Sequence, residues 1–459
     1  MKLNLVKLGP LFILVVLAVN ACTANNTNTS TVATQSSPST PTPTASPTPA
    51  VEHQTSSSVT LPVVDALLTN DQFVSELKAK LQVQDAEISS LKNAASEEVN
   101  RLRSTNAEST DSTSSDDRAR AREQIEKVLG NQRTDQFVSL ANDFWANGGE
   151  ANTTNDKQPA VKTPNTVPSD TRVVVNIPAY RMDLFRDGSL IKSYKIGIGY
   201  PEFPLPQGLR KAQSIIFNPT WTPPDSPWVA NMKNVTAGEK VEAGSKLNPL
   251  GPIKIPIGMP SLIHGGKSPA KLGTFASHGC VGLTNAQVKD FAQMLAKISN
   301  TEVSSESIAK FLSDPTQTHV VKLKETVPVE LRYETIVLED GKLHIYKDVY
   351  RQDSNTEDNL RKVLEANGSS LESLSEDERT QSLNALNAMS MHPSQPVASP
   401  SPTNQSTAKK SATVKPPAKN QKEIVIELAS LTSKGYPSPV SLDVGTGKAV
   451  TAAVRKPTK

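Results

Sequence analysis

Residues 277–283 read Ser-His-Gly-Cys-Val-Gly-Leu, and a further His-Gly pair precedes them at residues 264–265. The first stretch holds Cys280, one of only two cysteines in a chain of 459 residues. A thiol must lose its proton to attack a carbonyl, and a nearby imidazole usually takes that proton near neutral pH. This combination therefore predicts thiol-dependent acyl transfer.

Two histidines are candidates for the base. His278 lies two residues from Cys280, and a neighbour that close rarely reaches the sulfur in good geometry. His264 is distant enough to approach from another strand, the more usual arrangement of nucleophile and base. Gly279 allows a sharp turn that frees the N–H groups of Gly279 and Cys280 for an oxyanion, an effect of about 3 kcal/mol per donor.

The pattern His264-Gly265 followed by Ser277-His278-Gly279-Cys280 resembles the signature of the L,D-transpeptidases, which have a YkuD-type catalytic domain. The segments Asn248-Pro249-Leu250-Gly251 and Asn218-Pro219-Thr220-Trp221 also resemble the family, and the resemblance covers less than half of the chain. One departure is Gly282, which stands where the family often has an arginine.

The resemblance implies a β-sandwich-like fold and a reaction on peptidoglycan. The cysteine attacks the stem peptide at the carbonyl of its third residue, expels the terminal D-Ala, and passes the acyl group to an amine of a neighbouring stem, forming a 3-3 crosslink. It implies no cofactor and no metal. The implied roles are Cys280 as nucleophile, His264 as proton donor and acceptor, Ser277, His278, Gly279 and Gly265 as residues shaping the site and the oxyanion hole, and Asn248 and Trp221 as substrate contacts.

The N-terminal residues indicate export. Residues 1–21 combine early lysines, an apolar run and a small residue at the cut site, as in a signal peptide. Residues 17–22 resemble a bacterial lipobox ending in Cys22, although signal cleavage without lipidation stays open. We therefore expect a lipoprotein anchored through Cys22 in the cell envelope and facing the periplasm or extracytoplasmic space. An acylated Cys22 would leave Cys280 without a disulfide partner.

The chain divides into segments of different composition. Residues 22–60 form a Ser/Thr/Pro-rich linker, and residues 61–150 predict a helical module with a possible protein partner. Its apolar residues recur every seven positions at Val74, Leu81, Ile88, Ala95 and Leu102, and a second helix from Asp116 to Trp145 is expected to break near Gly130.

A second linker, residues 151–170, leads to a mainly β catalytic domain at residues 171–352. Asp187-Gly188 and Asp340-Gly341 predict hairpins there, and residues 286–298 predict a helix. A weakly helical segment (353–392), a Pro-rich linker (393–421) and a small β tail (422–459) follow. We therefore expect a multidomain chain with a mainly β catalytic domain, an N-terminal α-helical module and disordered linkers.

Several alternatives stay open. Cys280 is a buried structural thiol in one, and joins His264 and His278 as a zinc ligand in another, although no fourth ligand stands at a telling spacing. Water as acceptor gives an L,D-carboxypeptidase, and a protein amine gives a ligase that attaches proteins to peptidoglycan. A non-catalytic lipoprotein that binds peptidoglycan is the third class. A net charge of +3 without a basic block argues against nucleic acid.

Overall fold

The structure is a computed structural model. It describes residues 59–68, 70–104, 114–146, 163–224, 226–230, 232–390, 421–431, 435–446 and 449–450. The expected signal peptide, Cys22, and most of the three expected linkers lie outside these residues. Within the described ranges, no helix has both the length and the apolar character needed to cross a bilayer.

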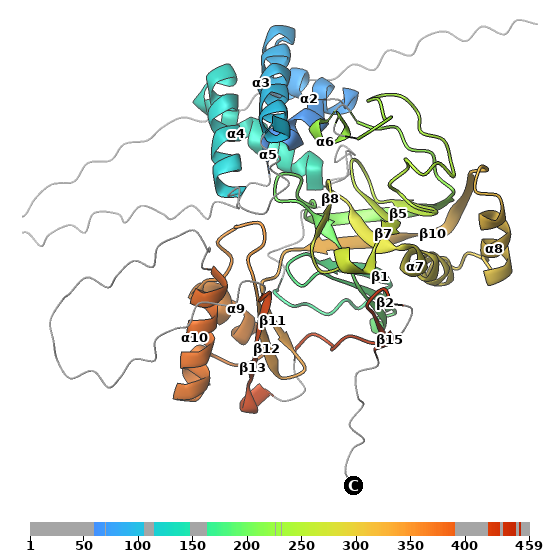
Figure 1. The fold of residues 1–459 in the computed structure, drawn as a ribbon. Helices are drawn as coiled ribbons and strands as arrows, with labels where there is room; N and C mark the ends of the chain where they lie inside the picture. The colour runs from blue at the N-terminus through green and yellow to red at the C-terminus, as the bar shows by residue number, and fades with distance from the viewer. Residues whose placement is uncertain are drawn as a thin grey trace, which may run out of the picture. The chain divides into compact units, whose positions relative to one another are not determined.

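Five helices form the N-terminal module: α1 (Leu61–Leu68), α2 (Asp71–Leu81), α3 (Asp85–Ser104), α4 (Ser114–Leu129) and α5 (Asn131–Ala146) (Figure 1). Their apolar stripes meet around Phe73, whose ring lies 5.9 Å from that of Phe137 and 5.1 Å from that of Phe144. The predicted helical module is thus confirmed.

The seven-residue repeat does not run along one helix. Gln82 has φ 54° and ends α2 in the left-handed conformation, so the repeat is divided between α2 and α3. The break expected at Gly130 is present, because Gly130 has φ 75° between α4 and α5.

The catalytic region contains a curled ten-stranded sheet in the order β15-β14-β3-β2-β1-β10-β5-β6-β7-β9. The hairpin predicted at Asp187-Gly188 joins β2 to β3, and both turn residues have positive φ, as a type I′ turn requires. The strands are β1 (Arg172–Asn176), β2 (Arg181–Arg186), β3 (Ser189–Lys195), β5 (Gly208–Phe217), β6 (Ile253–Pro256), β7 (Leu262–Lys267), β9 (Val281–Thr284), β10 (His319–Arg332), β14 (Leu442–Asp443) and β15 (Ala449–Val450).

Shorter elements connect these strands. β4 (Ile198–Gly199) pairs with β8 (Phe275–Ser277) in a separate two-stranded sheet, and the 3-10 turn η1 (Pro269–Lys271) precedes β8. The helices are α6 (Pro227–Ala230), α7 (Asn285–Ile298) and α8 (Ser305–Ser313). The mainly β character predicted for this region is confirmed.

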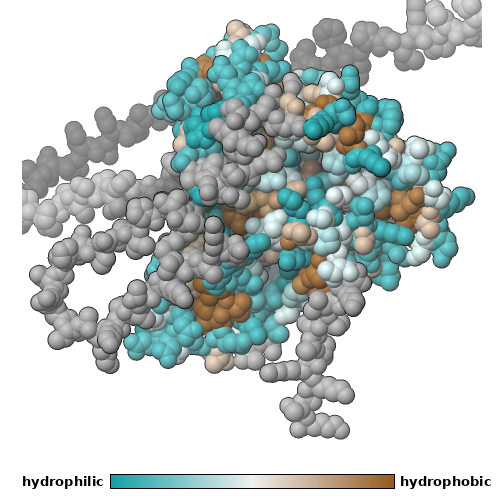
Figure 2. All heavy atoms as spheres, in the orientation of Figure 1, coloured by the Kyte–Doolittle hydropathy of each residue, from teal (hydrophilic) through white to brown (hydrophobic). Residues whose placement is uncertain are grey.

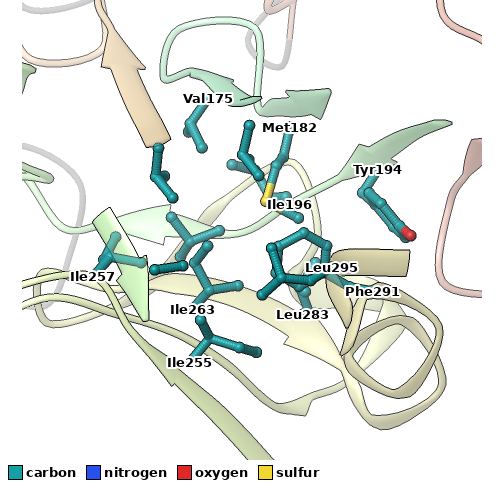
Figure 3. Close-up of a cluster of buried hydrophobic side chains, with 14 of the residues drawn as sticks. Val175, Met182, Tyr194, Ile196, Ile255, Ile257, Ile263, Leu283, Phe291 and Leu295 are labelled. Atoms are coloured by element: carbon teal, nitrogen blue, oxygen red, sulfur yellow. The ribbon is translucent and has the colours of Figure 1, made fainter. Parts of the chain in front are cut away.

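Helix α7 covers one face of strands β6, β7 and β9. Figure 3 shows Ile255, Ile263 and Leu283 of these strands directed into one apolar cluster with Phe291 and Leu295 of α7. All five side chains are fully buried. The helix begins at a capping box in which the Thr284 side chain accepts from the Gln287 backbone, so its start is fixed directly after β9.

The C-terminal part of the described chain corrects our expectation. We expected the hairpin at Asp340-Gly341 to belong to the catalytic domain, residues 171–352. Instead β11 (Ile336–Glu339) and β12 (Lys342–Tyr346) form a three-stranded sheet with β13 (Glu423–Glu427). Helices α9 (Glu357–Ala366) and α10 (Glu376–Ser390) and the 3-10 turns η2 (Leu371–Ser373) and η3 (Ala429–Leu431) contribute to its apolar core.

This second sheet has its own apolar core. Its third strand is β13, which we expected to belong to a separate tail. The tail also extends the large sheet, since β14 pairs with β3. Arg181 of β2 links the two sheets through ion pairs to Asp183 and to Glu339 of β11.

The surface is hydrophilic with small apolar patches. On the face in Figure 2 the hydrophobic residues form separate patches among hydrophilic ones. Exposed large apolar side chains are scattered along the described chain, as is normal for a folded surface. They are Val167, Leu209, Leu247, Met259, Val320, Val425 and Val440.

Two neighbouring residues of β13 test the second core. Ile426 is 5% exposed and belongs to this core, whereas Val425 beside it is 46% exposed. Ile426→Ala should destabilise the three-stranded unit by about 2–4 kcal/mol, because it leaves a cavity. The matched control Val425→Ala should change the stability by less than about 0.5 kcal/mol. Hydrogen exchange of the β12 amides measures both, and equal effects would contradict this core.

Candidate active site

The pairing of β7 with β9 brings the two segments of the motif together. The strands are parallel, with Ile263 opposite Val281 and His264 opposite Gly282. Side chains alternate between the faces of a strand, and Ile263 and Val281 point into the core. His264 therefore lies on the opposite face, and Cys280 directly precedes β9, two residues before the residue paired with His264. The pairing thus brings the segments that hold the predicted nucleophile and the predicted base side by side.

His264 is held as a neutral base. Its ring is buried, and Nδ1 lies 2.7 Å from the carbonyl oxygen of Gly265. A carbonyl can only accept, so in the neutral ring Nδ1 carries the proton and Nε2 keeps its lone pair. Burial, with a smaller contribution from the charge of Lys267, lowers the pKa of His264 to about 3. The imidazole is thus uncharged at neutral pH and keeps a lone pair on Nε2.

The Cys280 thiol is half-buried and protonated in the resting state. Burial raises its pKa above the ordinary value, while a hydrogen bond from the Leu262 backbone and the charges of Lys267 and Arg210 oppose this rise. Sulfur and imidazole therefore start as a neutral pair rather than as a thiolate–imidazolium pair. For Cys280 to act as the predicted nucleophile, its proton would have to move while the sulfur attacks.

The turn before Cys280 is held by two serines. Ser277 Oγ accepts a hydrogen bond from the Cys280 N–H at 3.1 Å and donates to the Cys280 carbonyl. Ser261 Oγ donates to the Gly279 carbonyl at 2.7 Å, and Gly279 has φ 89°, which favours glycine.

These contacts change the expected oxyanion hole. The Cys280 amide is already occupied by Ser277, so our expectation that it is free was wrong. The Gly279 N–H, in contrast, has no acceptor among the residues that the structure describes. It stays the predicted oxyanion donor.

His278 belongs to an aromatic stack. Its ring lies 4.2 Å from that of Trp228 of α6 with an interplanar angle of 8°, and Phe203 meets it edge-on at 4.9 Å. Trp228 in turn stacks on Trp221 at 5.7 Å. Burial lowers the pKa of His278 to about 3, so this ring is also neutral. Its packing fits the shaping role predicted for it.

The two expected substrate contacts lie in the long connection between β5 and β6. Asn248 donates to the Pro219 carbonyl at 2.7 Å and accepts from the Leu250 N–H at 3.0 Å, so its amide holds the loop. Trp221 is 7% exposed. Both side chains therefore support the loop that carries Trp228, and their direct contact with substrate stays a prediction.

Gly265 is required by close packing. A Cβ there would lie 2.8 Å from Val288 Cγ1 of α7, too close for any larger residue without movement. The small residue allows α7 to approach β7 beside His264.

The structure also brings in two residues that the sequence analysis did not single out. Lys267 follows on β7, and Arg210 lies on β5, and both act electrostatically on Cys280. In the sequence, the only indication of a role for Lys267 was the absence of a side chain at Gly282. Arg210 belongs to no recognisable motif. Within the described chain, no group of three or more His, Cys, Asp or Glu side chains is arranged to hold a metal ion.

Residues 170–327 match the family model of YkuD, the L,D-transpeptidase catalytic domain. This part of the chain is therefore an L,D-transpeptidase catalytic domain of the YkuD family. The resemblance found in the motif is confirmed. No curated protein gives a significant match to the sequence.

Among solved structures, the chain is similar to the catalytic domain of an L,D-transpeptidase from E. faecium, with 17% identity, covering 36% of this chain and 100% of that one, at a TM-score of 0.24. An L,D-transpeptidase from Mycobacterium smegmatis is 14% identical to this chain. The match covers 36% of this chain and 58% of that one, at a TM-score of 0.22. The Ldtfm–avibactam carbamoyl enzyme is 17% identical to this chain, at a TM-score of 0.24. The match covers 36% of this chain and 50% of that one, so the chain spans half the length of that protein.

The neutral state of His264 has a measurable consequence. An unfolded histidine binds a proton below pH about 6.5, whereas folded His264 does so only near pH 3. Between these values the unfolded state holds the extra proton, so the free energy of unfolding should fall as the pH drops. NMR titration should find the His264 ring neutral at pH 5, with the denatured chain as control. A midpoint near 6.5 in the folded protein would contradict this site.

Proposed function

We propose that this chain transfers an acyl group from peptidoglycan stem peptides through a thioester on Cys280, releases the terminal D-Ala and forms a 3-3 crosslink. The observation that supports the proposal is the β7–β9 pairing within an L,D-transpeptidase domain, in which His264 lies opposite Gly282, two residues after Cys280. The neutral imidazole is the form that a general base needs.

In the first half-reaction the sulfur bonds to the carbonyl carbon of the third stem residue while its proton moves to Nε2 of His264. The resulting oxyanion accepts a hydrogen bond from the Gly279 N–H. When the intermediate collapses, the C–N bond to D-Ala breaks and His264 returns the proton to the departing amine. The products are free D-Ala and the thioester.

In the second half-reaction an amine of a neighbouring stem attacks the thioester carbonyl and gives a proton to His264. The C–S bond breaks, and His264 protonates the leaving sulfur. Water in place of the amine gives a carboxypeptidase, and a protein amine gives an attachment reaction. The half-buried Cys280 thiol favours none of these acceptors by itself, so product analysis must distinguish them.

The location belongs to the proposal as well. The export signal and the lipobox-like sequence ending in Cys22 support a lipoprotein in the cell envelope, where peptidoglycan lies. A partner for the helical module, residues 61–150, is likewise a proposal. Labelling of Cys22 by a lipid precursor, absent in Cys22→Ala, tests the anchor.

Replacement of the two central residues tests the chemistry. Cys280→Ala should form no acyl-enzyme with a tetrapeptide stem, because the attacking atom is gone. His264→Ala should lower the rate of acylation by roughly 10²–10⁴, the usual contribution of a general base. Mass spectrometry of the protein and of released D-Ala measures both.

The outcome that contradicts the mechanism is continued D-Ala release by Cys280→Ala. Labelling with a thiol-reactive carbapenem separates the remaining class, because a non-catalytic peptidoglycan-binding protein with an inert thiol should not react. Products formed with and without an added stem amine then identify the acceptor.

The serine under the nucleophile gives a milder prediction. Ser277→Ala removes both hydrogen bonds to the Cys280 backbone and should lower the acylation rate by about tenfold, the effect of roughly 1.4 kcal/mol. Ser313→Ala, on the exposed helix α8, is the matched control and should leave the rate unchanged. Equal rates for the two variants, measured by single-turnover kinetics, would show that the turn needs no serine.

A further inference from the structure

Two cations, Lys267 and Arg210, act on the Cys280 thiol. Neither forms an ion pair with a carboxylate that the structure describes. A negative charge on Cys280 would favour the cationic form of each. A cation removed from water without a counter-ion is unfavourable, so a site that keeps the buried Arg210 and the partly buried Lys267 is suited to negative charge.

Arg210 is the more buried of the two, with 2% of its surface exposed. One edge of its guanidinium is engaged, because Nη1 donates to the carbonyls of Gly258 and Met259 at 2.9 and 3.1 Å. The other nitrogens, Nε and Nη2, are buried and find no acceptor in the described part of the chain. Burial lowers the pKa of Arg210 to about 9, which still leaves it charged at neutral pH.

The turn that Arg210 holds is linked to the nucleophile. Ser261, which ends this turn through its N–H bond to Gly258, donates its hydroxyl to the Gly279 carbonyl at 2.7 Å. The guanidinium is thus fixed to the same structure that supports the Cys280 turn.

Lys267 reaches the site because residue 282 has no side chain. A Cβ on Gly282 would lie 2.9 Å from Lys267 Cγ and 3.0 Å from Cε, so the lysine chain fills the space above this glycine. The strand register also places Lys267 on the face of Gly282. After an irregularity in β7, Lys267 pairs with Thr284 and therefore shares the face of His264. An arginine at position 282 would have to displace it.

We propose that Arg210 and Lys267 are positioning residues that stabilise the negative charge formed on the Cys280 sulfur when its proton moves to His264. The inference rests on the proposed nucleophilic role of Cys280. Lys267 supplies, from β7, a cation in the place that Gly282 leaves open, and Arg210 supplies a second one from β5. Neither touches the transferred proton.

The other groups around the sulfur do not provide this charge. His264 and His278 are neutral. Lys254 of β6 acts on His264 and donates to the Thr220 carbonyl, and Lys271 acts on Lys267. No carboxylate acts on the thiol among the described groups. Removal of Lys267 or Arg210 should therefore raise the pKa of the thiol.

The pH dependence of alkylation of the full chain by iodoacetamide tests the proposal without any substrate. The second cysteine is removed by Cys22→Ala in every variant. At pH 8, Lys267→Met and Arg210→Met should each slow the reaction roughly tenfold, the effect of one pKa unit, and the midpoint should move to higher pH. Lys267→Arg should keep the parent profile, and Lys271→Met is the matched control that should also leave it unchanged.

Two further variants protect the test against simple unfolding. If Arg210→Met does not fold, Arg210→Lys keeps a charge at this position. Its rate of alkylation at pH 8 should lie between the parent rate and the roughly tenfold lower rate expected without the charge. Lys267→Ala combined with Gly282→Arg restores a cation from the opposite strand and should recover most of the rate. If the Met variants alkylate with the parent midpoint, or if Lys267→Arg is as slow as Lys267→Met, the proposal is wrong.

This result is separate from the fate of the proposed function. A shifted thiol midpoint in the variants of a chain that releases no D-Ala would retain the electrostatic role and reject the transpeptidation. An unshifted midpoint in the variants of a chain that does release D-Ala would reject the electrostatic role and retain the transpeptidation.

Discussion

The structure depends on one alignment, the parallel register between β7 and β9. Ile263 and Val281 lock it, because both are fully buried under α7, and a slip by one residue would exchange the two faces of a strand. The same register that fills the core with these side chains turns His264 to the other face and sets Cys280 directly before β9, close to it in the sequence of the paired strand. The apolar core and the reactive pair are thus two consequences of one hydrogen-bonding pattern.

The charge states within the site follow from its burial. Burial alone would make the thiol hard to ionise, and it keeps both histidines neutral. Lys267 and Arg210 work against this on the sulfur, while Lys267 adds to it on the imidazole, which stays uncharged. The buried Arg210 and the partly buried Lys267 pair with no carboxylate in the described part of the chain, which reduces stability. Such a cost beside a predicted reactive group is the common conflict between a stable interior and a working site.

The sequence predicted the parts of this arrangement that are written in local patterns. The thiol and distant imidazole, the Asp187-Gly188 hairpin and the helix after β9 follow from residue types at short spacing. The pairing of β12 with β13 could not be predicted, because a long Pro-rich segment separates the two strands. Arg210 and Lys267 were missed for a different reason: their relevance depends on where long side chains extend. The occupied Cys280 amide likewise depends on the rotamer of Ser277.

The most direct test of the central claim is a crystal structure of the acyl-enzyme formed with a carbapenem. The account predicts a covalent bond to Cys280 Sγ, the acyl oxygen directed at the Gly279 N–H, and Nε2 of His264 on the same face of the sheet and turned to the sulfur. An imidazole on the α7 side of the sheet, or an acyl group attached to a different residue, would contradict it.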